Sequence, residues 1–156
     1  MKIAIASDHG GFELKEQIKA AFAEPGRVFA DPGTGGAANI ELVDLGTDSE
    51  EPVDYPVFAK ICAEYVASGQ AERGITICGT GIGASIAANK VRGIRCALVT
   101  GDEYARLASS HNHANMIALG GRFTAPEDAL RYIKIWLETP WDGGRHDRRV
   151  AELNEM

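Results

Sequence analysis

No stretch of this sequence is apolar over the roughly 20 residues that a membrane-spanning helix needs, and charge interrupts the first residues too soon for a signal peptide. A surplus of positive charge is also missing, because 16 Lys and Arg residues stand against 22 Asp and Glu residues and the formal net charge is −6. Nucleic acids and anionic membrane surfaces bind clustered cations, so we expect neither as a partner. A small phosphate ligand stays open, since a few well-placed donors suffice to bind it.

The sequence is also poor in cysteine, and its three thiols are Cys62, Cys78 and Cys96. They form no CxxC pair, so the ligand spacing of a structural zinc site is absent. Three widely spaced thiols do not make a disulfide framework either. We therefore expect reduced cysteines, a cytoplasmic location and no metal site.

Apolar runs of strand length alternate with segments of helical period along most of the chain. Strands are expected at 3–6, 42–45, 74–78, 95–99 and 116–119, and helices at about 14–22, 57–66, 84–88, 102–110 and 130–137. Continuous apolar strands separated by helices predict a parallel sheet that is covered on both faces. The predicted fold is therefore a single-domain α/β structure, a Rossmann-like doubly wound sheet of five parallel strands within residues 1–140.

Two segments fit this pattern less well. Residues 25–39 are rich in glycine and proline and are expected to be an inserted loop. The C-terminal tail, 141–156, is polar, and as a helix it would offer only Val150 and Leu153 as an apolar face. We expect this tail helix to pack on a partner subunit.

The loops that follow the strands of a doubly wound sheet gather at one edge, where such folds bind ligands. Four polar clusters fall in these loops, at 8–11, 78–83, 101–102 and 120–122. We therefore expect the ligand site along this edge.

The most informative of these clusters is the glycine-rich turn at 79–83. Glycines directly after a strand can expose backbone N–H groups at a helix N-terminus, which attract a phosphate or the oxyanion of an enediolate. A plain tight turn would use the same residues. Gly79, Gly81 and Ala84 also match the GxGxxA dinucleotide pattern, with Asp102 near the expected distance. From the residues alone, all three interpretations stay open.

Three further features fit either chemistry or structure. Cys78 ends a strand just ahead of the glycine turn, where amide dipoles favour a thiolate, although most free cysteines are buried apolar residues. His111 lies in a connection rich in histidine and asparagine and could transfer protons. Arg145 and Arg149 are four residues apart, so on a helix they share a face that suits a phosphate or is simply solvated.

Several short motifs, taken in their order along the chain, resemble the ribose-5-phosphate isomerase B family, whose relatives act on galactose 6-phosphate and allose 6-phosphate. These motifs are DHGGF at 8–12 with LK at 14–15, DLGT at 44–47, DYP at 54–56, ICGTGIG at 77–83 with AANK at 87–90, HN at 111–112 with Asn115, and GGRH at 143–146. The resemblance covers nearly the whole chain. It implies an aldose–ketose isomerase that interconverts ribose 5-phosphate and ribulose 5-phosphate through an enediolate, with neither metal nor cofactor.

The resemblance also implies catalytic roles. The family takes its base either from a cysteine ahead of the glycine turn or from a glutamate after it. Here these positions hold Cys78 and Ala84, so Cys78 is expected to be the base. Thr80 would position or activate the thiol, and His111 would open the furanose ring by acid–base transfer.

The implied substrate-binding set is larger. Asp8 would bind sugar hydroxyls, and Tyr55 would line the pocket. The oxyanion would be held by Asn112 and by the amides of Gly79, Gly81 and Gly83. The phosphate would be bound by His9, Arg122, Arg145, His146 and Arg149. Because the family's tail reaches into the neighbouring subunit, a homodimer or a dimer of dimers with shared active sites is expected.

Two alternative functions stay open at this point: an isomerase of a six-carbon sugar phosphate, such as allose 6-phosphate or galactose 6-phosphate, and a non-catalytic phosphate- or nucleotide-binding module. The chain also departs from the family pattern. The 25–39 segment is longer than the usual connection, His113 stands where an acidic residue is expected, and Ser7 stands where several relatives carry cysteine.

Overall fold

Five parallel strands form one sheet in the order β2-β1-β3-β5-β4. The strands are β1 (Lys2–Ser7), β2 (Glu41–Asp44), β3 (Arg73–Cys78), β4 (Cys96–Leu98) and β5 (Met116–Gly120). The computed structural model describes residues 1–24, 26, 28 and 40–156. Most of the expected insertion at 25–39 therefore lies outside the described residues. All strand pairs are parallel, which confirms the predicted doubly wound α/β fold.

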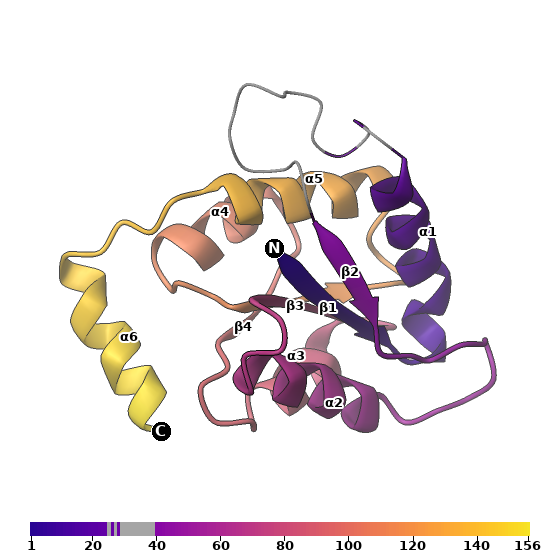
Figure 1. Ribbon diagram of the computed structural model, residues 1–156, viewed down its shortest axis with the longest axis horizontal. Coiled ribbons are helices and arrows are strands. Elements are labelled where there is room, and N and C mark those ends of the chain that lie inside the picture. The colour runs from indigo at the N-terminus through magenta and orange to yellow at the C-terminus, as the bar shows by residue number, and fades with distance from the viewer. Residues whose placement is uncertain (25, 27, 29–39) are drawn as a thin grey trace.

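In the part of the chain that the structure describes, six α-helices accompany the sheet, and each of the five expected helices is among them; Figure 1 shows their arrangement. They are α1 (Phe12–Ala23), α2 (Tyr55–Ala67), α3 (Ile82–Ala88), α4 (Asp102–Ser110), α5 (Pro126–Glu138) and the tail helix α6 (Arg145–Glu155). A short 3-10 helix, His9–Gly11, was not predicted. It forms because Asp8 caps it, its Oδ1 accepting the N–H of Gly11 at 3.1 Å. None of the helices in the described part of the chain has the length and apolar character to span a bilayer.

The two faces of the sheet differ in side-chain size, because successive strand residues point to opposite faces. Ile3 and Ile5 of β1 face the layer of α1, α4 and α5, where Trp136 is fully buried. Ala4 and Ala6 face α2 and α3, and their small side chains let these helices approach closely. Figure 1 shows the helices arranged on both sides of the sheet.

A buried lysine connects α1 to the end of β2. The Nζ of Lys15, a fully buried residue, donates to Asp44 Oδ2 at 2.6 Å and to Glu16 Oε1 at 2.8 Å. Burial alone would raise the pKa of Asp44, but hydrogen bonds from Lys15 and Lys19 outweigh it, so this pKa lies below its ordinary value. Asp44 Oδ1 also accepts the N–H of Gly46 at 3.0 Å. This network fixes the loop that leaves β2 at the carboxyl edge of the sheet.

Candidate active site

The loops that follow β1, β3 and β5 meet at the carboxyl edge of the sheet. The backbone N–H of Asp8 donates to Ile77 O at 3.2 Å, and that of Gly121 donates to Cys78 O at 2.8 Å. The N–H of Arg122 reaches Gly79 O at 3.1 Å. Hydrogen bonds between loops thus place Asp8, Cys78 and Arg122 in one region, as the sequence predicted.

Cys78 is the last residue of β3 and is 4% exposed. Its apolar neighbours are small, namely Ala59 of α2 and Ala84 of α3. The N–H of Gly81 donates to its Sγ at 3.2 Å, an arrangement that supports negative charge on sulfur. Gly81 has a φ of 78°, a left-handed conformation that glycine adopts without penalty and that aims its amide back at the sulfur.

The other two thiols have structural surroundings. Cys62 is fully buried on α2, and its Sγ contacts the carbonyl of Ile75 at 3.5 Å. Burial raises the pKa of Cys62 to about 12, despite that hydrogen bond. Burial likewise raises the pKa of Cys96 far above its ordinary value. Both remain neutral thiols near pH 8, as expected of packing residues.

Thr80 and Gly81 use part of the expected amide nest inside the turn itself. Thr80 Oγ1 accepts the N–H of Ile82 at 3.2 Å, while the N–H of Gly81 is bound to Cys78 Sγ. The sequence predicted these amides as donors to a ligand. In the structure, two amides of the turn donate to side chains of the turn itself. They are free to do so because the first N–H groups of a helix have no carbonyl partner within it.

Tyr55 and Arg122 flank the glycine turn. A Cβ added at Gly83 would lie 2.6 Å from the ring of Tyr55, and one added at Gly79 would lie 3.1 Å from the guanidinium of Arg122. Glycine at these two positions therefore makes room for both side chains. His9 Nδ1 lies 3.2 Å from the backbone of Val53, which anchors the segment leading into α2.

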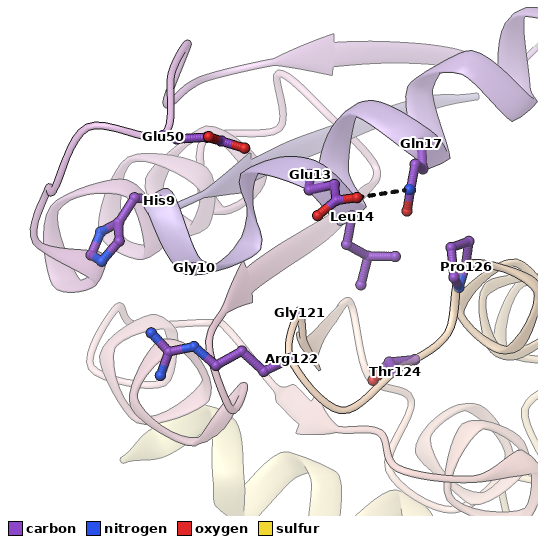
Figure 2. A pocket seen from close by; sticks show the side chains of 10 residues that line it. All are labelled: His9, Gly10, Glu13, Leu14, Gln17, Glu50, Gly121, Arg122, Thr124 and Pro126. Carbon is purple, nitrogen blue, oxygen red and sulfur yellow. Dashed lines mark hydrogen bonds between the residues drawn. The ribbon is translucent and has the colours of Figure 1, made fainter.

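A cavity of about 460 Å³ adjoins this region between the start of α1 and the turn after β5 (Figure 2). His9 and Arg122 lie at one end of it, whereas Glu13 and Gln17 of α1 lie at the other and share a hydrogen bond of 3.4 Å. Cys78 is not among its lining residues. The cationic end, beside Gly79 and the glycine turn, suits an anionic group of a ligand.

The remaining predicted site residues lie at the opposite end of the sheet. Gly74, near the start of β3, donates its N–H to Asn115 O at 3.0 Å, and Arg73 donates to Ala114 O at 3.2 Å. The length of β3, roughly 16 Å, therefore separates this connection from Cys78. His111 and Asn112 belong to the same connection, so one chain does not bring them to Cys78.

The tail helix lies with this second group. His111 and His146 stack with ring centroids 4.2 Å apart, and His111 Nε2 is 3.7 Å from Asp142 Oδ2. Arg145 and Arg149 share the first turns of α6. Figure 1 shows α6 at the left, on the far side of the molecule from the arrowheads of β1 and β2. The predicted site is thus divided into two groups, one at each end of the sheet.

Electrostatics within the second group favour an anion. Burial, together with the neighbouring His111, Arg145 and Arg149, holds the pKa of His146 below its ordinary value. His146 is then neutral near pH 7 and can donate a hydrogen bond. Asp142 was missed by the sequence reasoning, because nothing distinguishes it from other acidic residues of a polar tail.

His111, Asp142 and His146 could also be considered as metal ligands, since their donor atoms lie within 4.8 Å of one another. The two imidazoles, however, are stacked at an interplanar angle of 17°, so their in-plane lone pairs do not converge on one point. Arg145 Nε also donates to His146 Nε2 at 3.3 Å. The arrangement fits proton transfer and anion binding better than a metal ion.

Comparisons with known proteins show a similarity that covers both groups of residues. The model of a family described as Ribose/Galactose Isomerase matches residues 3–153. The ribose-5-phosphate isomerase B of Escherichia coli (strain K12) is 42% identical over 155 residues, 99% of this chain and 95% of that protein. A crystal structure of a ribose 5-phosphate isomerase from Thermotoga maritima shares 48% identity with a TM-score of 0.88, over 99% of this chain and 98% of that one. The Mycoplasma genitalium ribose-5-phosphate isomerase B with bound ribulose-5-phosphate shares 35% identity with a TM-score of 0.84, over 99% and 94%.

Proposed function

Since the chain belongs to the ribose/galactose isomerase family, we propose that it interconverts ribose 5-phosphate and ribulose 5-phosphate. The observation that carries this proposal is the similarity to ribose-5-phosphate isomerases, which extends over every predicted site residue from Asp8 to Arg149. A sulfur that accepts an amide hydrogen bond beside a glycine turn supports it, because an isomerase needs a base near a group that holds an oxyanion.

The reaction begins with ring opening. Ribose 5-phosphate is mainly a furanose, so the hydroxyl at C1 must lose its proton while the ring oxygen gains one. His111 transfers this proton as acid and base, with Asp142 orienting the imidazole from 3.7 Å. The product of this step is the open-chain aldehyde.

Cys78 then acts as the base. Its thiolate removes the proton from C2, the C2 electrons form a double bond to C1, and the aldehyde oxygen becomes the enediolate oxyanion. A proton passes from O2 to O1, the carbonyl reforms at C2, and the Cys78 thiol returns its proton to C1. The N–H of Gly81 supports the thiolate, so Gly79, Gly83 and Asn112 are left to hold the oxyanion. Each such donor contributes on the order of 3 kcal/mol in other enzymes.

The phosphate anchors the substrate at a distance from the reacting carbons. Arg145 and Arg149 of α6 suit a dianion because each guanidinium can donate two parallel hydrogen bonds. His9 and Arg122 approach it from the cationic end of the cavity, and His146 adds a neutral donor. Binding energy from the phosphate orients C1 and C2 against Cys78.

Two copies of the chain form each complete site in this proposal. Cys78 and His111 lie at opposite ends of one sheet, so a second chain must supply one of them. An apolar surface next to the glycine turn supports a dimer. Its members, 40% to 56% exposed, are Val57, Ile61, Ile82 and Ile86. They lie four residues apart on α2 and on α3, which pack together, and exposed apolar clusters of this kind mark subunit contacts. The three free thiols suit the reducing cytoplasm, where we place the enzyme.

Incubation with ribose 5-phosphate in deuterated water tests the proposal. We expect deuterium to enter the substrate pool at C2 and C1 as ribulose 5-phosphate forms, since the base exchanges its proton with solvent. We also expect kcat/KM for ribose 5-phosphate to exceed that for allose 6-phosphate at least about tenfold, the discrimination typical of one additional carbon. Absence of both exchange and product at any protein concentration would reject isomerase function, and a higher kcat/KM for allose 6-phosphate would assign a six-carbon substrate.

A further inference from the structure

The tail helix α6 has few apolar contacts to fix its position. Of its 11 residues only His146 and Val150 are buried, and Leu153 is 43% exposed. Isolated helices of about 12 residues or fewer are marginal in water. Within one chain, the orientation of α6, and with it the placement of Arg145 and Arg149, therefore depends on a few specific contacts.

One such contact lies at the start of the helix. The ring of His113 stacks on Trp141, with centroids 5.0 Å apart and an interplanar angle of 20°. Trp141 in turn donates from Nε1 to Asp147 Oδ1 at 3.2 Å, in the first turn of α6, and meets His146 edge-on at 6.0 Å. Burial, followed by the nearby Arg95 and Arg73, lowers the pKa of His113, so the stacked imidazole is neutral near pH 7.

A second contact lies near the end of the helix. Arg95 donates from Nε and Nη2 to the carbonyl oxygen of His113 at 3.1 and 2.7 Å, and from Nε to that of Asn112 at 3.2 Å. Its Nη1 donates to Asn154 Oδ1 at 2.6 Å. The connection that carries His111 is thus attached to α6 at both ends of the helix, with Arg145 and Arg149 between the two attachments.

We propose that His113 and Arg95 are positioning residues, which hold the phosphate-binding face of α6 at a fixed place relative to His111. His113 acts through Trp141, and Arg95 acts through Asn154. One chain then contributes a rigid group to an active site, made of His111, Arg145 and Arg149. Binding of the phosphate to this group aligns the ring oxygen with its proton donor. The kinetic consequence of this inference rests on the proposed isomerase function. The attachment of α6 to the rest of the chain does not depend on that function.

The test compares His113→Ala, Trp141→Ala and the double variant with His113→Phe, which keeps the stacking but cannot ionise. We expect His113→Ala to raise KM for ribose 5-phosphate about tenfold, with a smaller fall in kcat, because substrate is lost from a misplaced arginine pair. His113→Phe should stay within about twofold of wild type, and the double variant should be no worse than either single variant. Asn154→Ala should raise KM about threefold. Tyr104→Ala removes an exposed aromatic ring outside this group and should leave KM unchanged.

Amide hydrogen exchange of α6 gives a readout that needs no substrate. We expect the amides of 145–155 to exchange about tenfold faster in His113→Ala and at the wild-type rate in His113→Phe. Unchanged exchange in His113→Ala, additive effects in the double variant, or His113→Phe as impaired as His113→Ala would overturn the proposal. Faster exchange with an unchanged KM would also overturn it, because attachment would then not serve binding. If the wild-type protein does not isomerise ribose 5-phosphate, the proposed function fails, and hydrogen exchange alone decides the attachment.

Discussion

Replacing Cys78 by alanine is expected to lower kcat for ribose 5-phosphate by at least about 10³-fold, the upper part of the range for a positioned acid–base group. Ala84, which packs against Cys78, carries no acid–base group that could take its place. The substitution should not disturb folding, because Cys78 packs against Ala59 and Ala84 and alanine fits among them. Steady-state kinetics together with thermal unfolding of both proteins checks the two statements.

Cys62 provides the matched control for this prediction. It is a buried thiol on α2, whose pKa is raised to about 12 by burial, so it cannot act as a thiolate near pH 8. Cys62→Ala should therefore lower stability by about 1 kcal/mol, the order expected for a small core truncation, while kcat stays close to wild type. Cys78→Ala protein that keeps a tenth of wild-type activity would remove this residue from the mechanism.

Replacing His111 by alanine should produce the second large effect, and it should depend on the form of the substrate. We expect turnover of ribose 5-phosphate to fall by about 10²-fold or more, since ring opening loses its proton donor. An analogue that lacks the C4 hydroxyl cannot close the furanose ring. Its turnover should fall less than about threefold, because the step that follows needs Cys78 and not His111.

The comparison of the two substrates separates a chemical role from a structural one. A variant that is merely misfolded or unable to bind phosphate would lose both activities together. Equal losses on ribose 5-phosphate and on the open-chain analogue would thus contradict ring opening by His111. Inorganic phosphate affinity, measured by calorimetry, should stay near wild type in His111→Ala, because the arginines of α6 are still present.

Much of the fold was predictable because its signals are local. The expected helix at 102–110 matches α4 residue for residue, and each expected strand lies within about a residue of an observed one. These elements follow from the spacing of the apolar residues and from the positions of glycine and proline. Both signals act over a few residues. The order β2-β1-β3-β5-β4 was not predicted, because the pairing of strands distant in sequence is not encoded in either segment alone.

The structure places the predicted site residues in two groups, an arrangement that was not predicted from the sequence. Asp8 and Arg122 follow strands and Cys78 ends one, so the topology rule placed them correctly at the carboxyl edge. His111 precedes a strand, and a helix that returns across a parallel sheet ends at the opposite edge. The sequence contained this signal, and it separates His111 from Cys78 within one chain. The contacts of His113 with Trp141, by contrast, join distant segments through side-chain packing and leave no sequence pattern.

Activity of a heterodimer tests the central claim most directly. Cys78→Ala and His111→Ala chains, each with a different affinity tag, are co-expressed, and the mixed dimer is purified through both tags. If Cys78 of one chain works with His111 of the other, each mixed dimer has one intact and one doubly defective site. It should then recover about half of the wild-type activity by two-fold symmetry, far above either parent. A mixed dimer as inactive as two inactive parents would mean that both residues act from the same chain, which would contradict the shared site.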